Sequence, residues 1–269
     1  MILFMKFKFK MILFILLCFI IKKLKSNYNY KIIYDIPESK PAGSNPIPVS
    51  NPIPESNPTM DIVVGPGGRY GTYTLGICHY IKNNFDISNK KILGFSSGSW
   101  NSLFMCMKKE YVTKALKRSF VLSKEPIPIM LKKTVEIFKS YSIDNFDIDN
   151  LYVATACFNK TIIYNKFLSL DELIRCCTSS SFIPGITYKD IIYFYKQRPT
   201  VDGGLHYKKY IKTLSPKTLV VNFKMFGRYK HINMMKEQFK KYKPSAYFLY
   251  IKGYQDAKKN HSYFEKYLN

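Results

Sequence analysis

Short runs of branched apolar residues alternate along the chain with segments in which apolar residues recur every three or four positions. The first pattern predicts buried strands, and the second predicts helices with one face toward a core. Strands are predicted at residues 61–64, 91–94, 151–157 and 218–223, and a strand or hairpin at 187–195. Helices are predicted around 75–81 and 99–109, and from Ser169, which forms a capping box with Glu172.

The first 26 residues have the pattern of a signal or a membrane anchor. Lysines at positions 6, 8 and 10 precede an uninterrupted apolar run from Met11 to Ile21, and further lysines follow it at once. That run covers only about half of a bilayer's hydrocarbon thickness, and no small-residue cleavage site follows. A removed secretory signal, an uncleaved anchor and an interfacial helix with snorkelling lysines all remain open.

Residues 27–60 are predicted to be a linker. Between Pro37 and Pro58 a six-residue repeat, Ser-Asn-Pro-Ile-Pro with a spacer, occurs twice and begins a third time. Prolines remove backbone donors and favour an extended polyproline conformation, so this stretch is expected to act as a semi-rigid spacer in front of a folded domain.

A glycine-rich loop, Gly65-Pro-Gly67-Gly68-Arg-Tyr-Gly71, joins the first predicted strand to the first predicted helix. Backbone N–H groups gathered at the start of a helix stabilise negative charge. The pattern alone has three interpretations: an oxyanion loop, a dinucleotide-binding turn without a clear acidic partner for a ribose, or a plain tight turn.

The second predicted strand leads into Gly94-Phe-Ser96-Ser-Gly98, which is the G-x-S-x-G pattern of a nucleophile elbow. In such an elbow a strained turn between strand and helix exposes the central serine. Gly94 and Gly98 are needed because side chains there would collide with the neighbouring strand and helix. Ser96 is therefore the candidate nucleophile, in preference to Ser97 and Ser99.

Two further motifs follow in order. The predicted third helix ends in the small-residue stretch Cys177-Thr-Ser-Ser-Ser-Phe-Ile-Pro184, and the predicted hairpin leads to Asp202-Gly203-Gly204. An aspartate before two glycines is by itself a common turn.

Together, the glycine loop, G-x-S-x-G, the small-residue stretch and Asp-Gly-Gly resemble the patatin-like phospholipase family over roughly residues 61–205. The resemblance implies an α/β fold, a three-layer α/β/α sandwich with a mostly parallel central sheet. It also implies hydrolysis of acyl esters by a Ser-Asp dyad without a catalytic histidine, metal or cofactor. Ser96 would then be the nucleophile and Asp202 the base, with an oxyanion hole from the N–H groups of Gly67 and Gly68. Gly65, Gly71, Gly94, Gly98, Gly203 and Gly204 would support these motifs.

The sequence departs from the family pattern in three places. Pro66 stands where a further glycine is usual and supplies no N–H. Tyr70 precedes the last glycine of the loop, whereas a basic residue usually does, and Arg69 comes one position earlier. Ser97 and Ser99 replace the small alanines that are common around the elbow.

Other functions compete with this interpretation. His206, His231 and His261 follow Asp202, which permits the chain order of a Ser-Asp-His triad, although His206 is close to Asp202 in sequence. The basic, tyrosine-rich segment 206–269 has the composition of a nucleic-acid-binding surface, but its predicted strand favours a part that completes the fold. A non-catalytic lipid-binding protein is the third possibility.

Charge sets the expected partners. Forty-two Lys and Arg against 18 Asp and Glu give a formal charge of +24, although the abundance of Lys, Asn, Ile, Tyr and Phe is also what A/T-rich codons produce. The expected partners are a phospholipid or other acyl-ester lipid and an anionic membrane surface, with nucleic acid disfavoured. Localisation at a membrane or in the secretory pathway depends on residues 1–26. The six cysteines lie in apolar stretches and are expected to be thiols with no zinc-site spacing.

Overall fold

In the computed structural model, the described residues are 31–35, 58–120, 125–188, 190–233, 237 and 244–269. The predicted signal or anchor at 1–26 lies outside them, and so does the proline repeat up to residue 57. Within the described ranges, none of the helices combines the length and apolar character needed to cross a bilayer.

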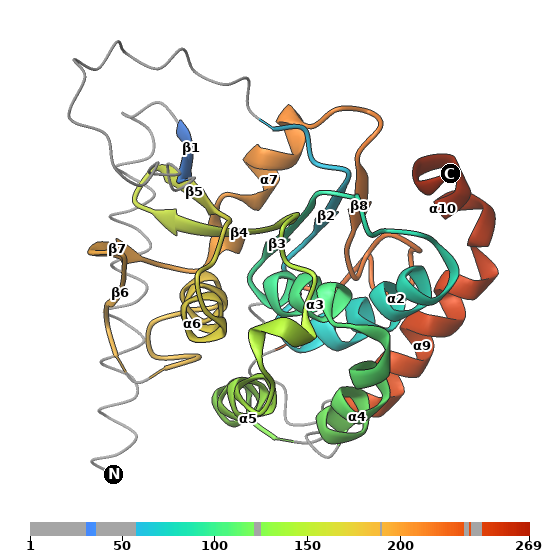
Figure 1. The fold of residues 1–269 in the computed structure, drawn as a ribbon, viewed down its shortest axis with the longest axis horizontal. Helices are drawn as coiled ribbons and strands as arrows, with labels where there is room; N and C mark the ends of the chain where they lie inside the picture. Colours follow the sequence, from blue (N-terminus) through green and yellow to red (C-terminus); the bar gives the residue numbers. More distant parts are fainter. Residues whose placement is uncertain (1–30, 36–57, 121–124, 189, 234–236, 238–243) are drawn as a thin grey trace.

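The described residues form an α/β fold around a mostly parallel six-stranded sheet (Figure 1). Its strand order is β1-β5-β4-β3-β2-β8, and every neighbouring pair is parallel except β4 with β5. The strands are β1 (Lys31–Asp35), β2 (Ile62–Val64), β3 (Ile92–Phe95), β4 (Leu151–Cys157), β5 (Lys160–Tyr164) and β8 (Leu219–Val221); β6 (Tyr193–Tyr195) and β7 (Arg198–Thr200) form a separate hairpin.

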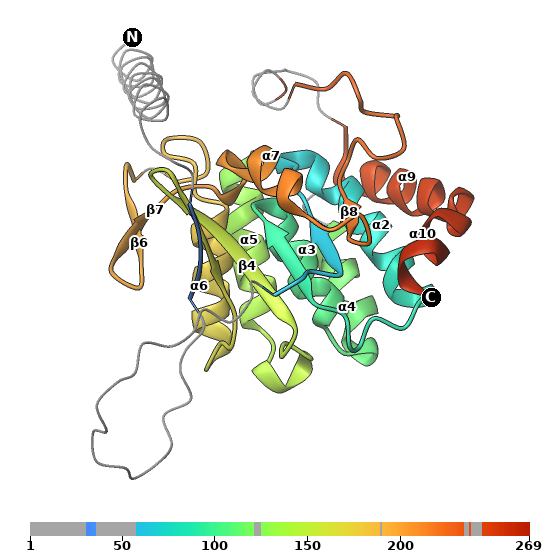
Figure 2. The same cartoon turned by 90° about the horizontal axis from the view of Figure 1, so that it is seen from above.

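Helices lie against both faces of this sheet. They are α2 (Gly71–Asn84), α3 (Ser97–Cys106), α4 (Lys109–Phe120), α5 (Ile127–Lys139), α6 (Leu170–Ser180), α7 (Tyr207–Tyr210), α9 (Ala246–Lys259) and α10 (His261–Leu268). Short 3-10 turns are η1 (Gly68–Tyr70), η2 (Ile143–Asn145), η3 (Gly203–Leu205) and η4 (Ile211–Thr213). Figure 2 shows how the helices surround the central strands.

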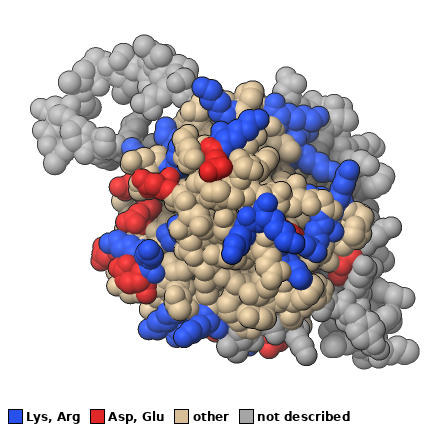
Figure 3. Space-filling view, turned by 90° about the vertical axis from the view of Figure 1, so that its right-hand side faces the viewer, with Lys and Arg blue, Asp and Glu red and all other residues tan. Residues whose placement is uncertain are grey.

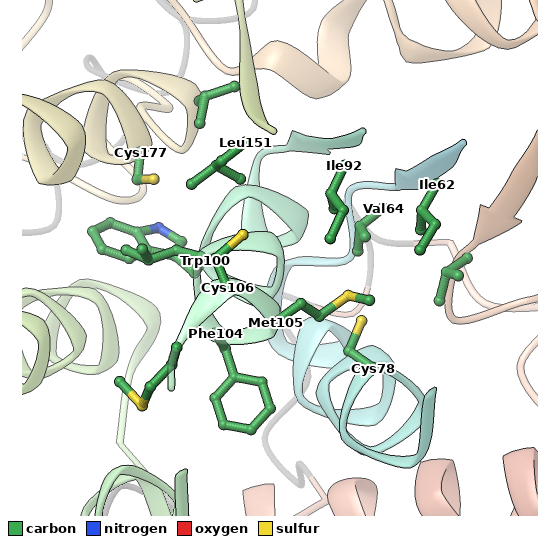
Figure 4. Close-up of a cluster of buried hydrophobic side chains, with 14 of the residues drawn as sticks. Ile62, Val64, Cys78, Ile92, Trp100, Phe104, Met105, Cys106, Leu151 and Cys177 are labelled. Atoms are coloured by element: carbon green, nitrogen blue, oxygen red, sulfur yellow. The ribbon is translucent and has the colours of Figure 1, made fainter. Parts of the chain in front are cut away.

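The two faces of the sheet are both apolar because alternate residues of each strand point to opposite sides. Ile62, Val64 and Ile92 pack with Leu103 and Met105 in the large core under α2, α3, α6 and α9, part of which Figure 4 shows. The other face is covered more thinly. There Val63, Leu93 and Phe95 contact Tyr207 and Tyr210, which come from α7.

Most predicted elements are present. The strands predicted at 61–64, 91–94, 151–157 and 218–223 correspond to β2, β3, β4 and β8, and the helices predicted around 75–81 and 99–109 to α2 and α3. Ser169 caps α6 by accepting the N–H of Glu172, but the Glu172 carboxylate accepts from the N–H of Leu168, one residue earlier than in a strict capping box. Cys78, Cys106, Cys176 and Cys177 are buried free thiols, as predicted.

Segments on both sides of residues 61–205 contribute to the sheet. Residues 31–35 fall inside the predicted linker 27–60, but they form β1 and pair with β5. The segment after residue 205 supplies β8, which pairs with β2, and α9, which packs along α2. The fold is therefore built from more of the chain than the motif-bearing residues 61–205.

Helices α2 and α9 approach so closely that two glycines are required between them. A Cβ on Gly76 would overlap the carbonyl oxygen of Tyr250, and a Cβ on Gly253 would overlap that of Tyr73. The Tyr73 hydroxyl donates to the Asp256 carboxylate at 2.7 Å across the same interface, and Arg228 also binds Asp256. This packing holds α9 against α2, the helix that follows the glycine loop.

We expect Gly76→Ala to destabilise the protein by more than about 2 kcal/mol, because a methyl group must displace backbone and overpacking outweighs the better helix propensity of alanine. The measurement is the free energy of unfolding in urea. Gln255→Ala, an exposed position on α9, is the control and should change that free energy by less than about 0.5 kcal/mol. Equal effects of the two substitutions would contradict the close approach.

Candidate active site

Ser96 stands at the turn between β3 and α3 in a backbone conformation that few non-glycine residues adopt. Its φ is 54° and its ψ is −127°. A Cβ on Gly94 would overlap the backbone of Ser99, and a Cβ on Gly98 would overlap the carbonyl oxygen of Val64. Both flanking glycines are thus required for α3 to start this close to β2 and β3, which confirms the steric reason given for the G-x-S-x-G pattern.

Asp202 is brought to Ser96 by the end of the neighbouring strand. Val201 pairs with Ala156 of β4 through two backbone hydrogen bonds of 2.8 and 3.1 Å, and the Asp202 N–H donates to the carbonyl of Phe182 at 2.8 Å. The Ser96 hydroxyl then donates to Asp202 Oδ2 at 2.6 Å. Two residues that are 106 positions apart in sequence are therefore in direct contact.

Further hydrogen bonds fix both partners. The Ser96 N–H donates to Ser180 Oγ at 2.8 Å, and the Ser180 hydroxyl donates to the carbonyl of Ala154 at 2.7 Å. Asp202 Oδ1 accepts the N–H of Gly204 at 2.7 Å. Gly203 is needed at its position, since a Cβ there would overlap the Ala154 carbonyl. One carboxylate oxygen of Asp202 is therefore bonded to the backbone of Gly204, and the other is bonded to Ser96.

Burial raises the pKa of Asp202 from its ordinary value of 3.8 to about 6, and the hydrogen bonds from Ser96 and Gly204 limit the rise. A carboxyl group with this pKa is charged at neutral pH but accepts a proton more readily than an exposed aspartate. Its properties fit a general base.

The glycine loop lies beside the serine. Gly68 has a φ of +49° and lines the same cavity as Ser96 and Asp202, whereas Gly67 precedes it outside the cavity lining. A Cβ on Gly65 would meet the Tyr207 ring, and one on Gly71 would meet the Ser97 side chain. The glycine loop therefore lies next to Ser96. Of the two glycines predicted to donate their N–H groups, Gly68 lines the cavity and Gly67 does not.

The cavity has a volume of about 160 Å³ and is mainly apolar beyond the Ser96–Asp202 pair. One wall comes from α2 and α3 and the opposite wall from α4 and α5. Its apolar lining consists of Leu75, Trp100, Phe104, Ala115, Ile127, Met130, Leu131, Ile137, Phe138, Ile183 and Ala246. Such a space can hold a hydrocarbon chain while a carbonyl group lies at Ser96.

Histidines do not line this cavity. The ring of His206, the candidate closest to Asp202, is 1% exposed and its Nε2 lies 2.8 Å from the carbonyl oxygen of Phe158. His261 lies 2.9 Å from the Tyr80 hydroxyl and stacks on Phe85. His231 is exposed. The hydrogen bonds described at Asp202 come from Ser96 and Gly204, which is the geometry of a Ser-Asp pair.

Sequence reasoning missed Ser180 and the helical wall of the cavity. Ser180 lies in the predicted small-residue stretch, but nothing in a run of serines distinguishes the one that accepts the Ser96 N–H. The sequence of helix α5 does contain a recognisable pattern. Ile127, Leu131, Thr134 and Phe138 recur at helical spacing, and all four line the cavity.

Comparison with protein families and curated proteins finds no match. The chain matches no family model and no curated protein. Among the described residues, no group of three or more His, Cys, Asp or Glu side chains is placed to hold a metal ion.

The raised pKa of Asp202 predicts a pH-dependent loss of stability. Because the folded state holds this proton more tightly than the unfolded state, stability falls as pH rises from about 4 to about 6. We expect the wild type to lose up to about 3 kcal/mol relative to Asp202→Asn across this window. Urea unfolding of both proteins at pH 4 and pH 7 measures the difference. A difference that stays constant with pH would contradict the shift.

Proposed function

We propose that the chain is a serine acyl-ester hydrolase that acts on lipids, with Ser96 as nucleophile and Asp202 as base. The observation that carries this proposal is the 2.6 Å contact between a strained serine at a strand-to-helix turn and a carboxylate of raised pKa. A patatin-like architecture, a three-layer α/β/α sandwich, belongs to the same proposal. Its support is the order of the motifs and the presence of helices on both sheet faces.

The chemistry follows from the positions of the groups. Ser96 Oγ attacks the ester carbonyl carbon while its proton passes to Asp202 Oδ2. The developing oxyanion is stabilised by backbone N–H groups of the glycine loop, Gly67 and Gly68, each worth about 2.7 to 4 kcal/mol in comparable sites. When the tetrahedral intermediate collapses, the alcohol leaves with the proton from Asp202. Water then attacks the acyl-serine, with Asp202 again accepting the proton. When this second tetrahedral intermediate collapses, the bond between Ser96 Oγ and the acyl carbon breaks, Ser96 takes the proton back from Asp202, and the carboxylic acid leaves.

The surroundings of the cavity favour a lipid substrate. Ala246 lines the cavity at the start of α9, and its neighbours Tyr247 and Phe248 are 54% and 50% exposed. Ile129, on the opposite wall, is 41% exposed between the lining residues Ile127 and Met130. Exposed aromatic and aliphatic side chains beside an apolar cavity suit an enzyme that takes its substrate from a lipid surface.

Positive charge is also present on the side of the molecule that carries α9 and α10. Figure 3, which shows that side, has several patches of Lys and Arg side chains, together with acidic groups that lie mainly toward its left edge. In α9 and α10 the lysines are Lys252, Lys258, Lys259 and Lys266. Each basic residue close to anionic headgroups contributes about 1 kcal/mol to membrane attraction, so an anionic membrane surface is the proposed partner.

We expect Ser96→Ala to abolish hydrolysis of a short-chain ester and covalent labelling by a fluorophosphonate probe. Ser97→Ala should keep most of both, since Ser97 is the first residue of α3 and its hydroxyl makes no hydrogen bond, whereas Ser96 is the serine bonded to Asp202. Asp202→Asn should lower kcat by orders of magnitude, because an amide cannot accept the serine proton. Mass spectrometry of the labelled protein identifies the modified residue.

The competing assignments make opposite forecasts. Labelling that survives Ser96→Ala and disappears in Ser97→Ala would reject the elbow assignment. If His206→Asn removed the activity of a stably folded protein while Asp202→Asn kept it, a histidine-dependent mechanism would replace the pair.

For the membrane partner, we expect Phe248→Ser to weaken binding to vesicles that contain phosphatidylserine, and binding of the wild type to fall as salt rises from 0.1 to 0.5 M. Phe194→Ser is the matched control. Phe194 is 63% exposed, but it lies on β6, on the other side of the molecule from α9 in Figure 1. Vesicle sedimentation measures both effects. Equal binding to neutral and anionic vesicles would show that the charge has no part in binding.

A further inference from the structure

Arg69 is a buried cation in the wall of the cavity. It lies in η1, between the glycines of the loop and the start of α2, and it lines the cavity together with Ser96 and Asp202. Only 6% of the residue is exposed. A guanidinium group keeps its charge in proteins, so burial here places a full positive charge in apolar surroundings.

The guanidinium has too few partners for its charge. Its Nη2 donates to the carbonyl of Glu125, while its Nε and Nη1 have no hydrogen-bond partner. The Glu125 carboxylate does not neutralise it, because that group pairs with Lys133 at 3.3 Å. Burial accordingly lowers the pKa of Arg69, and the neighbouring Tyr70 side chain counters only part of this effect.

Asp202 is not the missing partner. The two Asp202 oxygens accept hydrogen bonds from Ser96 and Gly204, and neither of these bonds comes from Arg69. The cation and Ser96 thus line the same cavity without being joined through Asp202. A ligand that binds to both residues would have its ester carbonyl at Ser96 and a negatively charged group at Arg69.

A buried, unpaired charge is strongly unfavourable, and an anion that enters the cavity recovers the lost interaction. Ser97 also lines the cavity, and its buried hydroxyl is likewise without a hydrogen-bond partner. We propose that Arg69 selects the substrate: it binds an oxyanion group, such as a phosphate, carried by the ester whose carbonyl lies at Ser96. This proposal rests on the proposed hydrolase function and adds a specificity-determining residue to it.

Binding can be tested without hydrolysis. In full-length Ser96→Ala protein, inorganic phosphate should raise the melting temperature by several degrees relative to chloride at equal ionic strength. The rise should disappear in Ser96→Ala/Arg69→Met and persist in part in Ser96→Ala/Arg69→Lys. No rise with phosphate, or a rise that survives Arg69→Met, would overturn the proposal. This measurement tests whether Arg69 binds an anion even if the protein hydrolyses no ester.

Lys82→Met is the matched control. Lys82 is a partly buried cation that donates to a backbone carbonyl, that of Met105, but it does not line the cavity. In the Ser96→Ala background it should leave the phosphate effect intact. Loss of the effect in this variant as well would mean that any buried cation matters, and would overturn the assignment to Arg69.

Kinetics then distinguish an ester-borne anion from a free one. A monoacylglycerol phosphate and the monoacylglycerol with the same chain serve as substrates. Arg69→Met should raise the ratio of their KM values about tenfold or more, and Arg69→Lys should raise it less. Inorganic phosphate should compete with the phosphate-bearing ester. An unchanged KM ratio, an equal fall in kcat for both esters, or phosphate binding without competition would each overturn the proposal.

Discussion

The positive φ of Ser96 is the constraint on which the rest of the site depends. A serine held in this conformation directs its hydroxyl away from β3 and toward the end of β4, where Asp202 lies. The conformation persists only because the surroundings enforce it: glycines on both sides admit α3, and the Ser96 N–H is held by Ser180. Ser180 is in turn bonded to the Ala154 carbonyl of β4, and Val201, which precedes Asp202, pairs with Ala156 of the same strand, so β4 holds both residues of the proposed pair.

The cavity concentrates several unfavourable groups in one place. Ser96 is strained, Asp202 is a carboxylate whose pKa burial has raised, and Arg69 is a cation with two unpartnered nitrogens. The strain at Ser96 and the burial of the Asp202 carboxylate and the Arg69 charge each cost stability, and the hydrogen bond from Ser96 offsets only part of the cost at Asp202. The large apolar core between the sheet and α2, α3 and α9 stabilises the fold and offsets these unfavourable groups.

The sequence predicts the local part of this arrangement and fails where distant segments meet. Glycines and a serine at fixed spacing identify the elbow because the steric requirement is local to Gly94 and Gly98. Strands β2, β3, β4 and β8 are recognisable as short apolar runs. Strand β1 was assigned to a linker, since five residues beside a proline-rich segment carry no sign of the partner that lies at β5. The unpaired state of Arg69 is invisible for the same reason, because burial without a partner is a property of the assembled cavity.

The order of strands in the sheet has a consequence for synthesis on the ribosome. Strand β2 is made early, yet one of its two neighbours, β8, ends at Val221, and β1 pairs only with residues 160–164. Contacts between α2 and α9 likewise join residues near 76 to residues near 250. Such long-range pairings form slowly because loop closure precedes the gain from contact. The nascent chain therefore carries Ser96 before Asp202, its partner in the proposed site, and α9, which packs against α2, have been made.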